Sequence, residues 1–207
     1  MDENLLVCAV LETHVKNRKL QKIGDNIFGN WNWITNMNQC DKGCRIMIGW
    51  HSDEVSVTII HSAKQSILCK IESVDGSVTI FCSFVYAANS GIERRMLWKD
   101  LNIYKRIVGN GYWVLLEDFN VTLNPNEHSA GGSYMTSDMT EFKDCVNQVE
   151  IEDISSNGLF YTWTKNLHKV RAGDYAGVLK KLDRSMGNEE VKRKATKPPY
   201  SSATFGV

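Results

Sequence analysis

The chain has 207 residues, of which 43% are hydrophobic and 23% charged, and its formal net charge at pH 7 is zero. This length and composition predict a folded core arranged as one large domain or two small ones. The neutral balance gives no sign of an extended basic surface, although it is compatible with a local basic patch. No apolar run is long enough for a membrane helix, and the polar start at residues 1–4 differs from a secretory signal. The six scattered cysteines favour a reducing intracellular compartment, nuclear or cytoplasmic.

Strands are predicted through the first half of the chain. The unbroken apolar run at residues 5–11 is typical of a strand covered on both faces. Residues 31–44 are rich in Asn, Trp and Gly, and are predicted to form a loop. Further strand candidates lie at residues 45–50, 55–60, 67–74 and 78–86. The dipeptide Asp75-Gly76 is a hairpin signal between the last two of these.

The second half is predicted to alternate between helix and strand. Apolar residues recur at helical spacing between residues 92 and 107, and residues 112–116 return to a strand pattern. A second helix is indicated by the apolar spacing over residues 139–149, with Asp138 and Glu141 placed as a cap pair.

One domain is predicted over residues 1–190, because no linker divides the chain and hairpins alternate with strand-helix-strand units. Its class is α/β, with packed mixed sheets and flanking helices. Residues 191–207 contain a basic cluster, two adjacent prolines and small polar residues without periodicity. They are predicted to form a disordered tail. The basic cluster is compatible with nucleic-acid contact, but composition favours a solvated tail.

The run at residues 114–120 is the most informative stretch of the chain. Apolar residues predict a buried strand, and Asp118 and Asn120 follow at its end. Two residues apart on a strand, their side chains point to the same side. A carboxylate and a carboxamide in this arrangement suit an oxygen-loving cation or an attacking water. The alternative is that both residues form a turn after the strand, which is a common role for Asp and Asn.

Polar residues also follow other apolar runs. If the strands are neighbours, these residues converge on one sheet edge, where sites of α/β proteins usually lie. Polar strand ends are common, so chance accounts for such a set as well. The residues concerned are Glu12, Tyr86, Asn89, Asp118, Asn120 and Asp183.

Several stretches around these residues match a known pattern in order and spacing. They include Leu11-Glu12-Thr13-His14, Val85-Tyr86-Ala87-Ala88-Asn89, Asp118-Phe119-Asn120 and Lys181-Leu182-Asp183-Arg184, together with residues 42–50, 93–98 and 157–163. In these stretches the chain resembles the endonuclease/exonuclease/phosphatase superfamily over about residues 5–190. More narrowly, it resembles the endonuclease-like domain of plant non-LTR (long-interspersed-type) retrotransposon proteins. The resemblance implies a two-sheet α/β sandwich of the DNase I-like type.

The resemblance also implies metal-assisted phosphodiester hydrolysis with Mg²⁺ or Mn²⁺, acting on DNA, RNA or a small phosphoester. Glu12 and Asp118 would be metal ligands, and Asp118 would also orient or deprotonate the attacking water. Asn120 would hold that water or a phosphate oxygen, Tyr86 would bond phosphate, and Asn89 would bind nearby. Asp183 matches the residue that orients a catalytic histidine near the family's C-terminus.

Three departures from the family pattern qualify that expectation. The family's first strand, with its Asn, would precede residue 5, and its final Ser-Asp-His strand is not found in residues 191–207. The five histidines match no such motif, and Glu117 stands where the family usually has Gly. We therefore expect a domain truncated at both ends, with an exposed edge along residues 5–11, no polymerase region, and impaired catalysis. The alternative is a non-catalytic remnant that binds nucleic acid or protein.

Overall fold

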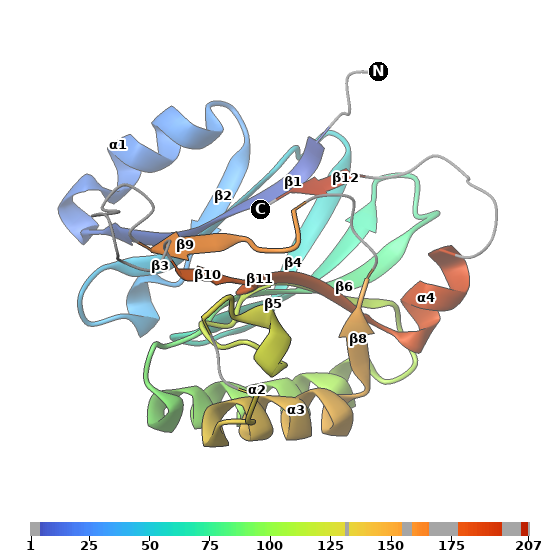
Figure 1. The fold of residues 1–207 in the computed structure, drawn as a ribbon. Coiled ribbons are helices and arrows are strands. Elements are labelled where there is room, and N and C mark those ends of the chain that lie inside the picture. Colours follow the sequence, from blue (N-terminus) through green and yellow to red (C-terminus); the bar gives the residue numbers. More distant parts are fainter. Residues whose placement is uncertain (1–4, 131–132, 155–158, 166–177, 196–203, 207) are drawn as a thin grey trace.

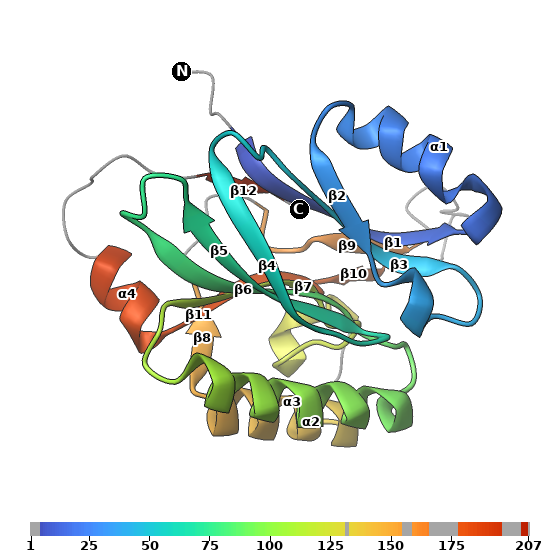
Figure 2. The same ribbon diagram turned by 180° about the vertical axis from the view of Figure 1, so that it is seen from behind.

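The computed structural model describes residues 5–130, 133–154, 159–165, 178–195 and 204–206. Two of their three β-sheets pack face to face, with helices on both outer sides, and the third is a separate two-stranded sheet (Figures 1 and 2). Helix α1 (Asn17–Phe28) lies at the top of Figure 1, and α2 (Gly91–Val108) and α3 (Ser137–Val149) lie at the bottom. In the described part of the chain, no helix is both long and apolar enough to span a membrane.

The smaller packed sheet has the strand order β12-β1-β3-β2. Its strands are β1 (Leu5–Val15), β2 (Asn32–Thr35), β3 (Cys44–Trp50) and β12 (Thr204–Gly206). β3 is antiparallel to β1 and β2, whereas β12 runs parallel to β1. Helix α1 packs on the outer face of this sheet, where Phe28 and Met47 are buried together. Gly49 permits this packing, because a Cβ there would lie 2.1 Å from the Phe28 ring.

The larger sheet has the order β4-β5-β6-β7-β11-β8. Its strands are β4 (Val55–Ser62), β5 (Ser66–Ser73), β6 (Thr79–Tyr86), β7 (Trp113–Asp118), β8 (Ile151–Asp153) and β11 (Asp183–Asn188). Only β6 and β7 pair in parallel, and α2 makes the crossover that a parallel pair requires. The remaining elements are η1 (Met37–Gln39), η2 (Pro125–Glu127), β9 (Trp163–Lys165), β10 (Val178–Lys180) and α4 (Glu189–Ala195).

Two apolar cores stabilise these layers. Between the sheets, Ile46 and Ile48 of β3 belong to the same buried cluster as Phe84 of β6. On the other face of the larger sheet, Leu101 of α2 and Phe142 of α3 lie in a second buried cluster. Full burial of each such side chain contributes about 1.5 to 3 kcal/mol. The structure therefore confirms the predicted two-sheet α/β sandwich with helices outside.

Local differences from the sequence predictions have identifiable causes. The loop predicted over residues 31–44 is wrong in part, because Asn32–Thr35 form β2 through pairing with β3, a contact distant in sequence. The cap pair predicted for α3 is also wrong. The hydroxyl of Thr136 caps this helix by accepting a hydrogen bond from the backbone N–H of Met139. Asp138 and Glu141 instead bind arginines of α2.

The C-terminal segment contains regular structure where a disordered tail was predicted. Residues 191–195 continue α4, and Thr204–Gly206 form β12, whereas residues 196–203 and 207 lie outside the described residues. β12 also corrects in part the expectation of an exposed edge along residues 5–11, because it pairs with Leu5, Val7 and Cys8 on the side of β1 opposite β3. Val7 and Ala9 of β1 are buried in the core between the two packed sheets.

Asn36 joins the two sheets through its side-chain amide, which is buried at 1% exposure. Its Oδ1 accepts hydrogen bonds from the backbone N–H groups of Arg45 and Ile46, both at 3.0 Å. Its Nδ2 donates to the carbonyl oxygens of Ala63 at 3.2 Å and Lys64 at 3.0 Å. The first two residues belong to β3 and the last two connect β4 to β5, so one amide bridges the sheets.

We expect Asn36→Leu to lower the free energy of unfolding by at least about 2 kcal/mol, because a buried polar group without a partner costs about 1 to 3 kcal/mol. Urea unfolding followed by circular dichroism measures this change. Asn38→Leu, at an exposed neighbouring position, is the control and should change stability by less than about 0.5 kcal/mol. Equal losses in the two variants would show that Asn36 does not bridge the sheets.

Candidate functional site

Three candidate residues form one row across the end of the larger sheet. Asp118 ends β7 and pairs in register with Tyr86, which ends β6, and with Asp183, which begins β11. The row forms because parallel strands end at the same sheet edge, whereas an antiparallel neighbour begins there. Residues in cross-strand register point to the same face. Tyr86 lies in the cluster between the sheets, so this face is directed toward the smaller sheet.

Glu12 reaches the row from the smaller sheet. The pairing of β1 with β3 is irregular between Leu11 and Val15, and within this irregularity Glu12 and His14 have φ values of 56° and 48°. Bulges of this kind re-aim a side chain. The left-handed backbone costs free energy in residues other than glycine, and such residues cluster at functional sites. The exposed carboxylate of Glu12 accepts a hydrogen bond from the Tyr86 hydroxyl.

The electrostatics of the row are those of closely spaced acids. Burial raises the pKa of Asp118 to about 6, a hydrogen bond from the backbone N–H of Asn120 opposes this shift, and the negative charges of Asp183 and Glu12 add to it. Burial, followed by the hydrogen bond to Glu12, raises the pKa of Tyr86 to about 12. Tyr86 therefore keeps its hydroxyl proton near neutral pH and is able to donate it in a hydrogen bond.

Asn120 lies directly beyond the row and is tied to both of its parallel strands. Its backbone N–H donates to Asp118 Oδ1 at 2.9 Å, and its Nδ2 donates to the carbonyl oxygen of Ala87 at 2.8 Å. Its φ is 52°, which makes it the third left-handed residue at the site after Glu12 and His14. Asn89 is exposed, and its backbone carbonyl, rather than its side chain, accepts a hydrogen bond from Arg94. The structure thus brings Asn120 to the row and places Asn89 on the loop beside it.

The sequence reasoning missed Arg94, which organises this loop. Its side chain is 2% exposed, and its Nη1 donates to the carbonyl oxygens of Ala88 and Asn89, both at 2.9 Å. Its Nη2 forms an ion pair with Asp138 at 2.5 Å. The signal was present, because Arg94 lies in the matched stretch at residues 93–98, but an arginine near a helix start gave no reason to expect burial.

His14 and Arg45 were also missed. The guanidinium of Arg45 lies 5.9 Å from the centroid of the Tyr86 ring. Its Nη1 lies 2.6 Å from Nε2 of the His14 imidazole, and this Nε2 lies 3.8 Å from Glu12 Oε1. The two residues add cationic and hydrogen-bonding capacity beside the acids. The start of β3, which contains Arg45, pairs with the end of β1, which contains His14. The two strands are distant in sequence, so the sequence alone did not indicate that these residues meet.

The candidate donors for a metal ion at the row are two carboxylates, from Glu12 and Asp118. No group of three or more His, Cys, Asp or Glu side chains in the described residues is arranged to hold a metal ion. Mg²⁺ usually keeps several waters and binds through one or two carboxylates. The chemistry of this pair therefore fits a hydrated Mg²⁺ or Mn²⁺ ion held by few protein ligands.

Glu117 points away from the site, into the interior beneath the larger sheet. It is 1% exposed, and neither carboxylate oxygen has a hydrogen-bond partner among the described residues. Burial raises the pKa of Glu117 well above its usual value of 4.5, although the nearby Arg184 acts in the opposite direction. Arg184 is engaged in ion pairs with Glu127 and Asp153. Glu117 therefore adds a buried acid on the far face of the larger sheet rather than a side chain beside Asp118.

We expect the stability of the protein to fall, through Glu117, as pH rises above about 4.5. A carboxyl whose pKa is raised by folding binds more protons in the folded state, so its contribution is complete below the unfolded pKa and is lost above it. Relative to Glu117→Gln, the parent should lose up to about 1.4 kcal/mol per pH unit. Urea unfolding at several pH values measures this difference, with Glu54→Gln as the exposed control. Parallel pH profiles for parent and Glu117→Gln would contradict the assignment.

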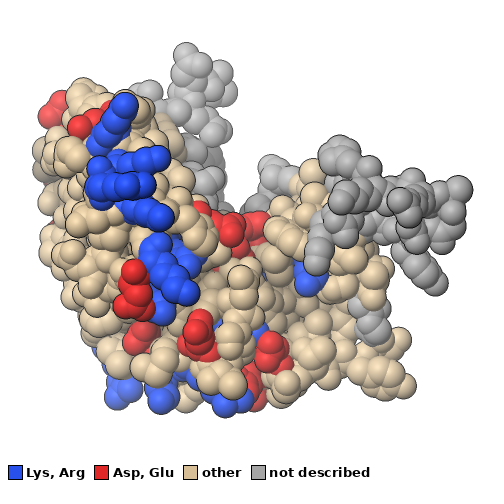
Figure 3. Space-filling view, turned by 90° about the vertical axis from the view of Figure 1, so that its left-hand side faces the viewer, with Lys and Arg blue, Asp and Glu red and all other residues tan. Residues whose placement is uncertain are grey.

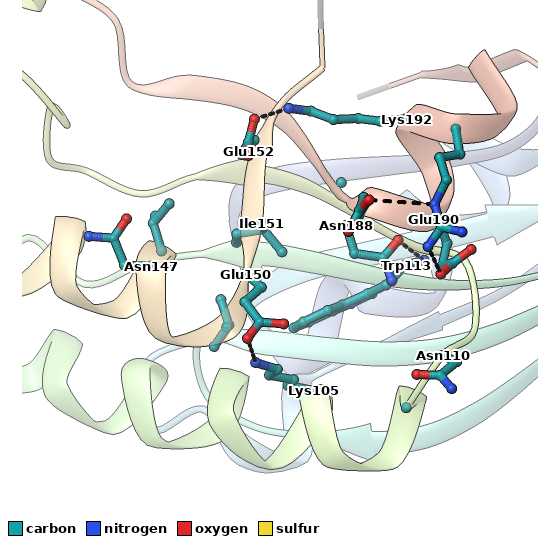
Figure 4. A pocket seen from close by; sticks show the side chains of 16 residues that line it. Lys105, Asn110, Trp113, Asn147, Glu150, Ile151, Glu152, Asn188, Glu190 and Lys192 are labelled. Carbon is teal, nitrogen blue, oxygen red and sulfur yellow. Dashed lines mark hydrogen bonds and ion pairs between the residues drawn. The ribbon is translucent and has the colours of Figure 1, made fainter. Parts of the chain in front are cut away.

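A separate pocket lies at the other end of the larger sheet (Figure 4). Its volume is about 560 Å³, and Trp113, the first residue of β7, lines it. The five residue steps from Trp113 to Asp118 span about 17 Å of strand. Charged side chains around the pocket form ion pairs, Lys105 with Glu150 and Lys192 with Glu152. This pocket is therefore distinct from the row of strand-end residues.

The fold has clear counterparts among solved structures. The endonuclease domain of TRAS1, a telomere-specific non-LTR retrotransposon, is similar with a TM-score of 0.66 at 9% identity, over 91% of this chain and 87% of that chain. The AP endonuclease LMAP from Leishmania major gives 0.65 at 10% identity, over 89% and 70%. TDP2 from D. rerio, complexed with a single-strand DNA product, gives 0.52 at 12% identity, over 93% and 73%. No protein-family model and no curated protein matches the sequence.

At sequence identities this low, the similarity shows a shared fold and nothing further. The protein has a DNase I-like fold, as the resemblance of its sequence motifs implied. The plant origin remains a prediction.

Proposed function

We propose that this domain is a divalent-metal-dependent phosphodiester hydrolase of the endonuclease type, with a nucleic acid as its substrate. The observation that carries the proposal is the row of Tyr86, Asp118 and Asp183, with Glu12 directed toward it from the opposite sheet. The names of similar folds support the same substrate class, since they include an AP endonuclease and a protein bound to a single-strand DNA product.

Glu12 and Asp118 would hold the cation, which when bound polarises the phosphate and stabilises negative charge on the leaving oxygen. The protonated Tyr86 hydroxyl would donate a hydrogen bond to a phosphate oxygen. Asp118, whose pKa is about 6, would orient the attacking water in its ionised form near neutral pH. The Asn120 amide, fixed by its bond to Ala87, would position this water or a second phosphate oxygen.

Slow turnover is part of the proposal. Within the described residues, no third carboxylate or histidine completes a metal-binding group with Glu12 and Asp118. His14 is the histidine placed at the site, and it is engaged by Arg45. These observations also favour a second candidate function, a non-catalytic module that binds nucleic acid. The two candidates differ in whether bound nucleic acid is cleaved.

Metal binding tests the donor set. We expect Mn²⁺ titration calorimetry to show weak binding to the parent, weakened at least about tenfold, or 1.4 kcal/mol, by Asp118→Ala or Glu12→Gln. Each variant removes one of the two carboxylates that hold the ion. Asp53→Ala, at an exposed acid away from the row, is the matched control. Unchanged affinity in Asp118→Ala would remove this residue from the metal site.

Cleavage tests the proposed function. We expect slow nicking of supercoiled plasmid or abasic duplex DNA in Mg²⁺, reduced by about 10² or more in Asp118→Ala, which is the usual contribution of a positioned general base. EDTA should abolish nicking. Binding of the same DNA without any nicking would favour the non-catalytic module. Nicking that persists in both EDTA and Asp118→Ala would reject this site altogether.

A further inference from the structure

Exposed cationic side chains gather where β1 leads into α1 and where the chain enters β3. We call this set the α1 patch. Among the described residues, no member of the patch has an ion-pair or side-chain hydrogen-bond partner. Its members are Lys16, Arg18, Lys19, Lys22 and Lys42.

Cations elsewhere in the described chain are mostly neutralised by acids. Lys64 pairs with Asp41, Lys70 with Glu72, and Arg95 with Glu141, to name three of several such pairs. The protein as a whole has equal numbers of acidic and basic residues. A local excess of unpaired positive charge in a neutral protein indicates an anionic partner at that face.

The patch opposes the electrostatics of its own helix. The first turn of α1 contains no acidic residue, although the partial positive charge of a helix N-terminus favours acids there. Arg18 and Lys22 are four residues apart and Lys19 lies between them, so the three share one helix face and repel each other. Nothing in the packing of α1 requires these charges, because the helix buries Phe28 on its opposite side.

The patch begins close to the candidate site. Lys16 follows β1 directly, four residues after Glu12, a separation of about 13 Å at most along an extended chain. An open groove of about 720 Å³ lies between the start of α1 and the loop before β3, lined by Lys16, Asn38 and Lys42 among others. Figure 3 views this side of the molecule and shows Lys and Arg side chains in a vertical run that descends toward Asp and Glu side chains.

We propose that the α1 patch holds the sugar-phosphate backbone of a nucleic acid whose neighbouring phosphodiester lies at the row of Tyr86, Asp118 and Asp183. This inference rests on the proposed function and adds the path that the polyanion takes across the protein. A nucleic acid fits better than an anionic membrane, because α1 buries Phe28 against the sheet and leaves Ile27 as its one large exposed apolar side chain, which is too little apolar surface to anchor a helix in lipid.

The test measures binding separately from cleavage. A labelled DNA duplex of about 20 base pairs is titrated in EDTA between about 50 and 200 mM NaCl, and anisotropy reports Kd. The Asp118→Ala protein serves as the background, so no cleavage intervenes. We expect the triple variant Arg18→Gln/Lys19→Gln/Lys22→Gln to lower the slope of log Kd against log salt by about 3, at about 0.9 per lost phosphate contact.

A matched control removes the same residue types from the opposite side of the molecule. Lys99, Arg106 and Lys143 are exposed on α2 and α3, and their triple Gln variant should leave Kd and the salt slope unchanged. The charge-retaining Lys19→Arg/Lys22→Arg variant should bind like the parent. If circular dichroism shows the patch triple to be unfolded, Arg18→Gln and Lys22→Gln alone should each lower the slope by about 1.

Three results would overturn the inference. The first is equal weakening of DNA binding by both triple variants, and the second is unchanged DNA binding in a folded patch triple or in the single variants. The third is binding to phosphatidylserine vesicles that depends on the patch, without DNA binding that depends on it. Its failure is separable from that of the proposed function. Metal-dependent nicking that Asp118→Ala abolishes, with unchanged binding in the patch triple, rejects the patch alone. Patch-dependent DNA binding without any nicking rejects hydrolysis and retains the patch.

Discussion

The guanidinium of Arg94 joins the segments on which the candidate site depends. It donates to the carbonyl oxygens of Ala88 and Asn89 after β6, approaches that of Asn120 after β7 at 3.4 Å, and pairs with Asp138 at the start of α3. The first two of these segments leave the sheet at the edge that carries Tyr86 and Asp118, and the second leads on to α3. One buried side chain therefore satisfies backbone groups that helices and strands leave without partners, and it does so with a charge that is itself paired.

The site also stores backbone strain on both sides of the row. Glu12 and Asn120 have left-handed φ values, one on each packed sheet. Asn tolerates this region because its short side chain bonds locally, and here it bonds Ala87. Glu has no such advantage, so the bulge in β1 must be maintained by pairing on both sides of it. The backbone conformation at these two positions therefore lowers the stability of the fold where the polar groups of the site lie.

The parts predicted from the sequence were those encoded by local pattern. Apolar runs and helical spacing located α2, α3, β3 to β7 and the strand ends at Tyr86 and Asp118, because buried residues recur with a fixed period in helices and strands. Asp183 was expected to follow an apolar run, whereas in the structure it begins β11. The features that the sequence did not predict depend on contacts between segments that are distant in the chain. β2 forms because it pairs with β3, and the charge of buried Arg94 is balanced by its ion pair with Asp138. Arg45 contacts Tyr86 only after the two sheets pack. Glu117 was visible as an unusual residue, but strand alternation alone decides whether its charge faces the site or the core.

The placement of Glu12 and Asp118 on different sheets links ligand binding to the packing of the whole sandwich. An ion held by both carboxylates would act as a clamp across the two layers, and its binding free energy would be lost in any state that lets the layers slide or separate. The occupied domain would then resist shear between its sheets more than the empty one, and would unfold at higher temperature by an amount set by ion concentration. Conversely, a cavity made in the core around Ile48 and Phe84 would weaken ion binding from a distance, without touching a ligand.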